Sequence, residues 1–410
     1  MQPSTVPQVR KAEVKHLTSR RSVAVAFLLV SSLCFARAAP ASGTAPFVLD
    51  GNRVYVDLSF VRPDGSIHRA LAFVDMGSPS MEVTSALFKE LQLDQGRQLI
   101  FHLGDLPVSI PAKEVTADPS DPYAIGSDLK VEAMLPAGVM QKYQVVLDYQ
   151  RQTLTFALPG TIKPQGTAVP FRVNPQTGLI AVDAVIAGKS YPVTIDNGSA
   201  YTWFRQDTVK TWLKTNPDWE RGVGAVGASN MMMSDDGAEA SGILLRIPEI
   251  VIGSLTSKQV GALGAGRGKG FSTNLDLFGW YSTKNAVPVI GWIGGNVLKG
   301  FRLTIDYPNR TMYWIQQSEP DVSDLNQVGL TLKMQGGEYV VAAIATKNGK
   351  PTVDGVQPGD KLIRIDGLDT KRSTWGGIYD ALHGKPNETR VLVIGRGANQ
   401  VTVNTTVTAF

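Results

Sequence analysis

Two short stretches of the sequence each lead an apolar run into a single carboxylate. Residues 71–80 are LAFVDMGSPS and residues 191–201 are YPVTIDNGSAY, so Asp75 and Asp196 are followed by Gly and Ser at the same spacing. An Asp beside apolar residues loses water and resists ionisation. A single stretch of this kind is most simply a strand that ends in a turn. The second copy favours a functional pair.

Two Asp side chains on facing turns can hydrolyse a bond by general acid–base catalysis. Close carboxyls cannot both ionise, so they share one proton and their pKa values split. The charged carboxyl can take a proton from a water held between them, and the neutral one can donate to a peptide carbonyl. We expect Gly77 and Gly198 to let the two turns approach closely. We also expect the hydroxyls of Ser78 and Ser199 each to hydrogen-bond the outer oxygen of their own Asp.

Other catalytic chemistries find little support in the sequence. The four His residues are scattered, and no pair has the spacing of metal ligands. No Gly-x-Ser-x-Gly motif of a serine hydrolase is present. We therefore expect neither a metal nor a cofactor.

The carboxylate stretches belong to a longer internal repeat. Residues 131–156 align without a gap with residues 289–314, which places Asp148-Tyr149 on Asp306-Tyr307. Internal repetition is a direct indication of architecture. It predicts two related β-rich lobes, each presenting one Asp on a turn.

Composition and turn signals extend this prediction to the whole chain. The 410 residues are 43% hydrophobic and 19% charged, as is typical of a globular protein. Short Val- and Thr-rich runs between turn residues predict mainly β structure. We predict an N-terminal lobe at 45–159, a C-terminal lobe at 165–316 and a small α+β domain at 325–410. The net charge of +4 is too small to favour nucleic acid as a partner.

The N-terminus has the three-part pattern of a secretory signal peptide at 1–38. Basic residues precede the apolar run SVAVAFLLVSSLCF, and Ala36-Arg37-Ala38 fits a small-x-small cleavage site. The run is short for an uncleaved membrane anchor, and Arg20-Arg21 leaves twin-arginine export open beside the general route. The only cysteine, Cys34, lies inside this segment. We therefore expect a mature chain without disulfides or a transmembrane segment, located in a bacterial periplasm or cell envelope.

The chain to about residue 316 resembles the aspartic proteases. The matching elements are Val74–Ser78, Ile195–Ser199 and the two Asp-Tyr strands. The resemblance implies a bilobal pepsin-like fold with the compact lobes of the retropepsin-like bacterial members. It also implies hydrolysis of polypeptide substrates at a dyad of Asp75 and Asp196.

The sequence departs from the family pattern at the two Thr positions and at one core position, and residues 96–120 hold no Tyr where a pepsin-type flap would supply one. The family usually has a Thr between the Asp and the Gly, whose hydroxyl ties the two turns together, whereas this chain has Met76 and Asn197. The Asn197 side chain can still bond across, but the Met76 side chain cannot donate. In addition, Val289-Ile290-Gly291 of the second copy corresponds to Val131-Glu132-Ala133 of the first, with a Glu at an expected core position.

Residues 325–410 resemble a PDZ domain of the kind fused to bacterial envelope proteases. The runs VQPGDKLIRIDG and ALHGKPNETRVLVIGR carry this resemblance. It implies that a peptide C-terminus adds as a strand beside a carboxylate-binding loop and edge strand. The implied peptide-binding residues are Gly329, Leu330, Thr331 and Leu332, with Ile378 and Leu382 lining the groove.

The sequence therefore predicts an exported aspartic endopeptidase with a PDZ domain that binds peptide or protein C-termini. The alternative is a catalytically inactive, protease-like scaffold that binds peptides, with partner recognition by the PDZ domain.

Overall fold

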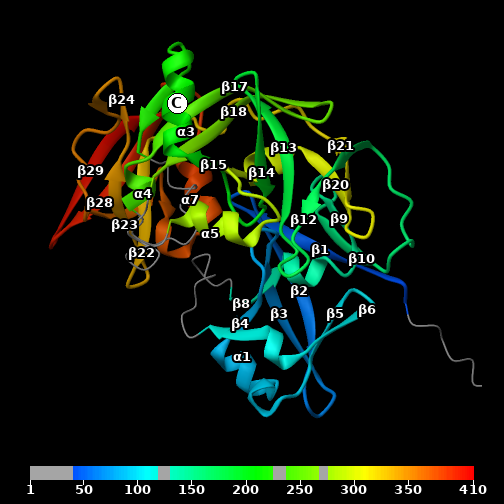
Figure 1. Ribbon diagram of the computed structural model, residues 1–410. Coiled ribbons are helices and arrows are strands. Elements are labelled where there is room, and N and C mark those ends of the chain that lie inside the picture. The colour runs from blue at the N-terminus through cyan, green and yellow to red at the C-terminus, as the bar shows by residue number, and fades with distance from the viewer. Residues whose placement is uncertain (1–39, 119–129, 225–236, 267–275) are drawn as a thin grey trace, which may run out of the picture. The chain divides into compact units, whose positions relative to one another are not determined.

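The computed structural model describes residues 40–118, 130–224, 237–266 and 276–410, which belong to one compact unit, Pro40–Phe410. The predicted signal peptide lies outside the described residues. The fold is mainly β, as the sequence predicts, with sheets of 13, 10 and 6 strands (Figure 1). Among the described helices, none is long and apolar enough to cross a membrane.

The first half of the chain delivers Asp75 at the end of a buried strand. Strands β1, β2 and β3 run antiparallel, and β3 then pairs in parallel with β8. Alternating burial along β1, β5 and β6 turns one face of each strand to the core. The elements are β1 (Ser42–Asp50), β2 (Arg53–Val61), β3 (Ile67–Asp75), β4 (Met81–Thr84), α1 (Ser85–Glu90), β5 (Leu99–Leu103), β6 (Leu106–Ile110), β7 (Val115–Asp118), β8 (Val131–Pro136), α2 (Ala137–Met140), β9 (Gln144–Asp148) and β10 (Thr153–Ala157).

The second half repeats this arrangement around Asp196. Strands β13 and β14 form a hairpin, and β14 pairs in parallel with β19 as β3 does with β8. The elements are β11 (Thr167–Pro170), β12 (Arg172–Val173), β13 (Ile180–Ile186), β14 (Lys189–Ile195), β15 (Thr202–Arg205), α3 (Gln206–Thr215), β16 (Arg221–Val223), α4 (Gly237–Ala240), β17 (Ile243–Ile252), β18 (Leu255–Ala265), α5 (Leu277–Lys284), β19 (Gly291–Ile293), α6 (Gly295–Leu298), β20 (Phe301–Asp306) and β21 (Thr311–Gln316).

The two repeats share one sheet, in which the Asp-Tyr strands β9 and β20 are antiparallel neighbours (Figure 1). The strand order β11-β21-β20-β9-β10-β1 is symmetric about this pair. Each of these two repeated Asp residues accepts a hydrogen bond from a Gln of the other half. Gln144 Nε2 donates to Asp306 Oδ2 at 3.1 Å, and Gln317 Nε2 donates to Asp148 Oδ1 at 2.8 Å. The pairing therefore fixes the two halves against each other.

The unexpected Glu132 lies at an irregularity of the β3–β8 ladder. The residues on either side of it pair with Leu71 and Ala72, which leaves Glu132 as a bulge. Its carboxylate accepts a hydrogen bond from Lys130 Nζ at 2.6 Å and lies 2.9 Å from His68 Nε2. Burial raises the pKa of Glu132, but these partners outweigh it and the net pKa is lowered. A partnered carboxylate outside the ladder explains why a Glu is tolerated here.

The last part of the chain forms the six-stranded sheet, in the order β22-β23-β26-β28-β29 with β27 on β26. Thr374 is the N-cap of helix α7, and its hydroxyl accepts from Gly377 N at 3.1 Å. The elements are β22 (Leu330–Gln335), β23 (Glu338–Ile344), β24 (Thr346–Lys347), β25 (Lys350–Pro351), β26 (Lys361–Ile365), β27 (Leu368–Asp369), α7 (Trp375–Leu382), β28 (Thr389–Arg396) and β29 (Asn399–Thr406).

A buried polar cluster around Asp324 joins this part to the second half. Asp324 pairs with Arg246 at 2.9 Å and accepts from Asn296 Nδ2 at 2.8 Å. The hydroxyls of Tyr201 and Tyr379 both donate to the Asp324 carbonyl. The predicted boundaries near 160 and 320 stay a prediction, because all described residues belong to one compact unit.

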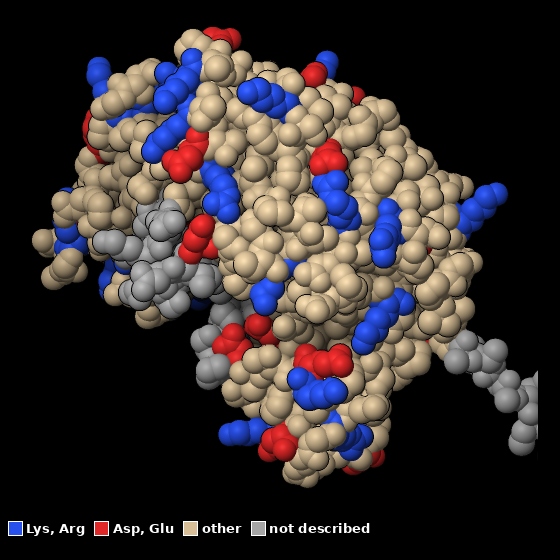
Figure 2. Space-filling view, viewed as in Figure 1, with Lys and Arg blue, Asp and Glu red and all other residues tan. Residues whose placement is uncertain are grey.

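A second junction lies at the tip of the β1–β2 hairpin. Asp50 accepts hydrogen bonds from Gly376 N at 2.8 Å and from the Thr374 hydroxyl, at the start of α7. Strand β24 also extends the ten-stranded sheet, because Thr346 pairs with Val223 of β16. On the face shown in Figure 2, basic and acidic side chains of the described residues are interspersed, so this face offers no large field of one sign.

Candidate active site

Asp75 ends β3, and the turn that follows binds its carboxyl. Gly77 N donates to Asp75 Oδ1 at 2.7 Å. The second half of β3 is buried between β2 and β8, where Phe73 and Val74 pack in the core. The Asp75 carboxyl is therefore held at the C-terminal end of an apolar strand segment.

Asp196 follows β14 and is bound in the same way. Its Oδ1 accepts from Gly198 N at 2.9 Å and from Ser199 N at 3.2 Å. Its own backbone N–H donates to Ile293 O of β19 at 3.1 Å. Asp196 is 1% exposed.

The two turns meet closely enough that each carboxyl lies against the glycine of the other turn. A Cβ added at Gly77 would lie 2.5 Å from Asp196 Cγ, and one at Gly198 would lie 2.4 Å from Asp75 Cγ. Real Cβ atoms do not approach other atoms so closely, so both positions require Gly. The structure thus brings together the four residues that the sequence pattern pairs.

The electrostatics of the pair follow from burial and like charge. Burial raises the pKa of Asp75, and the charge of Asp196 raises it further, to well above its usual range. Burial also raises the pKa of Asp196, while hydrogen bonds from the Tyr281 hydroxyl and the Ser199 backbone offset part of the rise. Two such carboxyls hold a shared proton more readily than two negative charges.

The Tyr281 hydroxyl is a member of the site that the sequence analysis did not predict. It donates to Asp196 Oδ2 at 2.8 Å from helix α5 and is buried at 3% exposure. The sequence holds only a weak signal for it, a Tyr in the aromatic run LFGWYS, 85 residues beyond the Asp that it contacts.

The predicted role of the two Ser hydroxyls is wrong. The Ser199 hydroxyl donates to Tyr201 O at 2.8 Å, while only its backbone N–H reaches Asp196. The Tyr281 hydroxyl binds the oxygen expected to accept from Ser199. Within the described part of the chain, Ser78 contacts its Asp through the backbone, from Ser78 N to Asp75 O at 3.4 Å.

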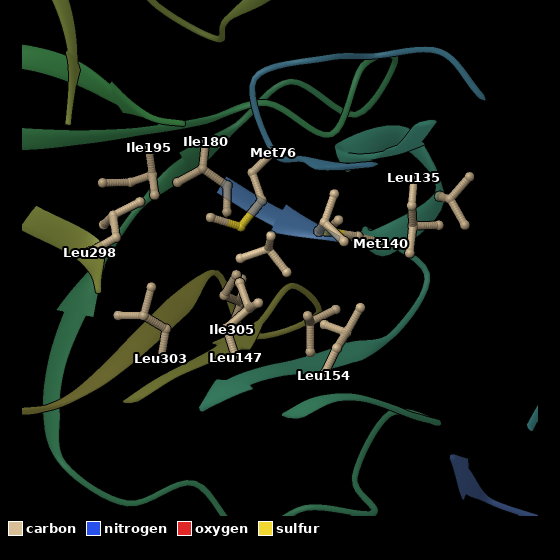
Figure 3. Packing of buried hydrophobic residues seen from close by; sticks show 14 of the residues in the cluster. Met76, Leu135, Met140, Leu147, Leu154, Ile180, Ile195, Leu298, Leu303 and Ile305 are labelled. Atoms are coloured by element: carbon tan, nitrogen blue, oxygen red, sulfur yellow. The ribbon is translucent and has the colours of Figure 1, made fainter. Parts of the chain in front are cut away.

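The two residues in the usual Thr positions join the turns in a different way. The Met76 backbone N–H donates to Asn197 Oδ1 at 2.8 Å, so a hydrogen bond still crosses between the turns. The Met76 side chain points into an apolar cluster drawn from both halves of the chain, among them Leu147 and Ile305 (Figure 3). Asn197 Nδ2 is buried with no hydrogen-bond partner among the described residues. The turns therefore keep the hydrogen bond that the Asn197 side chain accepts, and they lack one from the side chain at position 76.

The expected groove residues Ile378 and Leu382 do not line an accessible groove. Both are 1% exposed and belong to the hydrophobic core of the last sheet. The chain before β22 lies against the end of α7, because Val328 N donates to Leu382 O at 3.1 Å. The predicted loop and strand residues are buried as well: Gly329, Leu330, Thr331 and Leu332.

Comparisons with known proteins were made for sequence and for structure. No family model matches the sequence, and no curated protein matches it. Among solved structures, an aspartic proteinase from Irpex lacteus is 12% identical with a TM-score of 0.38, over 68% of this chain and 99% of that one. Basic 7S globulin from soybean is 10% identical with a TM-score of 0.39, over 68% of this chain and 95% of that one.

Proposed function

We propose that this protein is an aspartic endopeptidase that hydrolyses peptide bonds with a water activated by Asp75 and Asp196. The observation that carries the proposal is the meeting of two carboxyls from two repeated turns, Asp196 buried and Asp75 part-buried, each bound by the Gly N–H of its own turn. The raised pKa of each carboxyl, caused first by burial, supports a pair that shares one proton rather than one that carries two negative charges.

In the proposed reaction the ionised carboxyl takes a proton from a water held between the two side chains. The water oxygen attacks the peptide carbonyl carbon, and the protonated carboxyl gives its proton to the carbonyl oxygen. The first carboxyl then passes its proton to the amide nitrogen, and the C–N bond breaks. As that bond breaks, one hydroxyl of the gem-diol gives its proton to the second carboxyl, which restores the original protonation state of the pair.

An inactive peptide-binding scaffold is the second candidate. It is favoured by the loss of the Thr pair, because Asn197 Nδ2 has no partner in the described structure. The hydrogen bond from Met76 N to Asn197 Oδ1 favours the enzyme, because it keeps the turns in register.

We also infer export to a periplasm or cell envelope and recognition of peptide C-termini by residues 325–410. Both rest on sequence patterns: the leader at 1–38, and the runs that resemble a PDZ domain. The burial of Ile378 and Leu382 means that a peptide at this place would have to open the packing between α7 and β22.

The test is to incubate residues 39–410 with a randomised peptide library from pH 3 to pH 8 and to read the products by mass spectrometry. Cleavage that disappears in Asp75→Asn supports the peptidase. Peptides that co-purify with the protein without being cut support the scaffold. No cleavage by a verifiably folded protein at any pH would refute the peptidase.

A further inference from the structure

The two carboxyls of the Asp pair differ in how many hydrogen bonds they accept. Asp196 accepts from Gly198 N, Ser199 N and the Tyr281 hydroxyl, whereas Asp75 accepts from Gly77 N. Hydrogen bonds to a carboxylate favour its charged form. The repeat alone would make the pair symmetric, and the main departure from that symmetry is Tyr281.

Tyr281 is held in this position by packing around its ring. The ring centroid lies 5.0 Å from that of Trp292, which sits on β19, the strand that pairs with the end of β14. Trp292 in turn stacks on Trp203 at 5.2 Å and on Phe278 at 5.3 Å. The hydroxyl is thus aimed at Asp196 by a buried aromatic cluster.

Both ends of helix α5 are also fixed. Asn174 Nδ2 and the Thr177 hydroxyl donate to Lys284 O at 3.0 and 2.7 Å, in the last turn of the helix. Asp276, before its first turn, lies 3.6 Å from Arg205 Nη1. The helix therefore presents the hydroxyl without having to order itself when a substrate arrives.

The surroundings keep Tyr281 a donor and weigh against charge on Asp75. Burial first, and then the charges of Asp196 and Asp75, raise the pKa of Tyr281 well above its usual value, so the hydroxyl stays protonated. The charge of Glu82 on β4 also raises the pKa of Asp75. Both effects favour charge on Asp196 and the proton on Asp75.

We propose that Tyr281 is a positioning residue that holds Asp196 as the ionised member of the pair and leaves the proton on Asp75. This inference rests on the proposed function for its catalytic meaning: Asp196 takes the proton from water, and Asp75 donates to the substrate carbonyl. Tyr281 thereby fulfils the role that the sequence pattern assigned to the Ser199 hydroxyl.

The test measures protonation directly, so it does not depend on catalysis. The carboxyl carbons are labelled with ¹³C-Asp, and the signals of the pair are identified by their loss in Asp75→Asn and Asp196→Asn. In the unaltered protein we expect Asp196 to titrate at lower pH than Asp75. The Asp75→Asn background isolates Asp196, and adding Tyr281→Phe there should raise its midpoint by about one pH unit or more.

Tyr191→Phe is the matched control, because Tyr191 lies on β14 and its hydroxyl accepts from Trp212 Nε1 at 3.1 Å, away from the Asp pair. It should leave the Asp196 midpoint unchanged. The proposal is overturned if Tyr281→Phe leaves that midpoint unchanged, or if Asp75 titrates first in the unaltered protein.

Peptide cleavage is a separate readout of the same variants. If the protein cleaves peptides, the acid limb of kcat/KM should move upward in pH in Tyr281→Phe but not in Tyr191→Phe. If no peptide is cleaved and the midpoint still shifts, the role of Tyr281 stands and the peptidase proposal fails. Faster cleavage at every pH with an unmoved midpoint would instead make Tyr281 an obstruction and overturn the proposal.

Discussion

Substituting Gly198 by Ala tests whether the two Asp turns touch as described. The new Cβ would lie 2.4 Å from Asp75 Cγ and 2.4 Å from Asp75 Oδ1. Carbon atoms prefer separations of about 3.5–4.0 Å, so one partner must move by about 1 Å. The φ angle of Gly198 is not in the left-handed region, so the substitution adds a clash without adding backbone strain.

The expected consequence falls on activity more than on folding. Overpacking a buried site costs about 1–3 kcal/mol of stability, whereas displacing a catalytic group by about 1 Å costs about 100-fold in rate. We expect kcat/KM for a cleaved peptide to fall by about that factor, with the thermal unfolding midpoint lowered by only a few degrees. Gly77→Ala should behave alike, because its Cβ would lie 2.5 Å from Asp196 Cγ.

Gly300→Ala is the matched control, because its Cβ would meet the nearest atoms at an ordinary 3.5 Å. We expect it to keep both activity and stability. If Gly198→Ala retained kcat/KM within about twofold of the unaltered protein, the close approach of the turns would be refuted.

Three further outcomes follow from the same geometry. Asp75→Asn and Asp196→Asn should each lower peptide cleavage by about 100-fold or more with unchanged circular dichroism, and substantial cleavage by either would count against the pair. The folded pKa of Asp75 is raised above the unfolded value of 3.8, so its ionisation destabilises the fold as pH rises above about 4. Asp75→Asn should therefore raise the thermal unfolding midpoint at pH 7 and leave it nearly unchanged at pH 3. Differential scanning calorimetry at the two pH values measures both midpoints, and an unchanged midpoint at pH 7 would contradict this argument. Asp324→Asn should lower the free energy of unfolding, measured in urea, by about 3 kcal/mol or more, because it leaves the buried Arg246 without its charge partner. A decrease of less than about 1 kcal/mol would show that the pair contributes little.

The sequence predicts the parts of the site that depend on local spacing. Asp75 and Gly77 recur as Asp196 and Gly198, and a repeated turn must place the same atoms at the same local geometry. The mainly β fold follows in the same way from short alternating runs. These inferences need no knowledge of which strands become neighbours.

The parts that sequence reasoning missed depend on tertiary neighbours. Ser199 could bond its own Asp locally, but Tyr281 from a distant helix reaches that oxygen and the Ser hydroxyl bonds Tyr201 instead. Glu132 looked misplaced because the aligned repeats hide the bulge that removes it from the ladder. The resemblance to a PDZ domain places Ile378 in a groove, whereas the structure places it in the core of the last sheet. An apolar helix residue has the same sequence signature in both places.

The sheet shared by the two repeats also governs the order in which the molecule can be built during synthesis. Strand β1 pairs with β10 more than a hundred residues later, and β9 cannot acquire its neighbour β20 until residues 301–306 have been made. Pairings between distant segments form slowly, since a long loop must close before any contact stabilises it. A nascent chain that has just produced Asp196 therefore has both carboxyls but lacks the β9–β20 pairing that holds the two halves together. The Asp pair becomes a chemical site only late, when most of the polypeptide has already emerged.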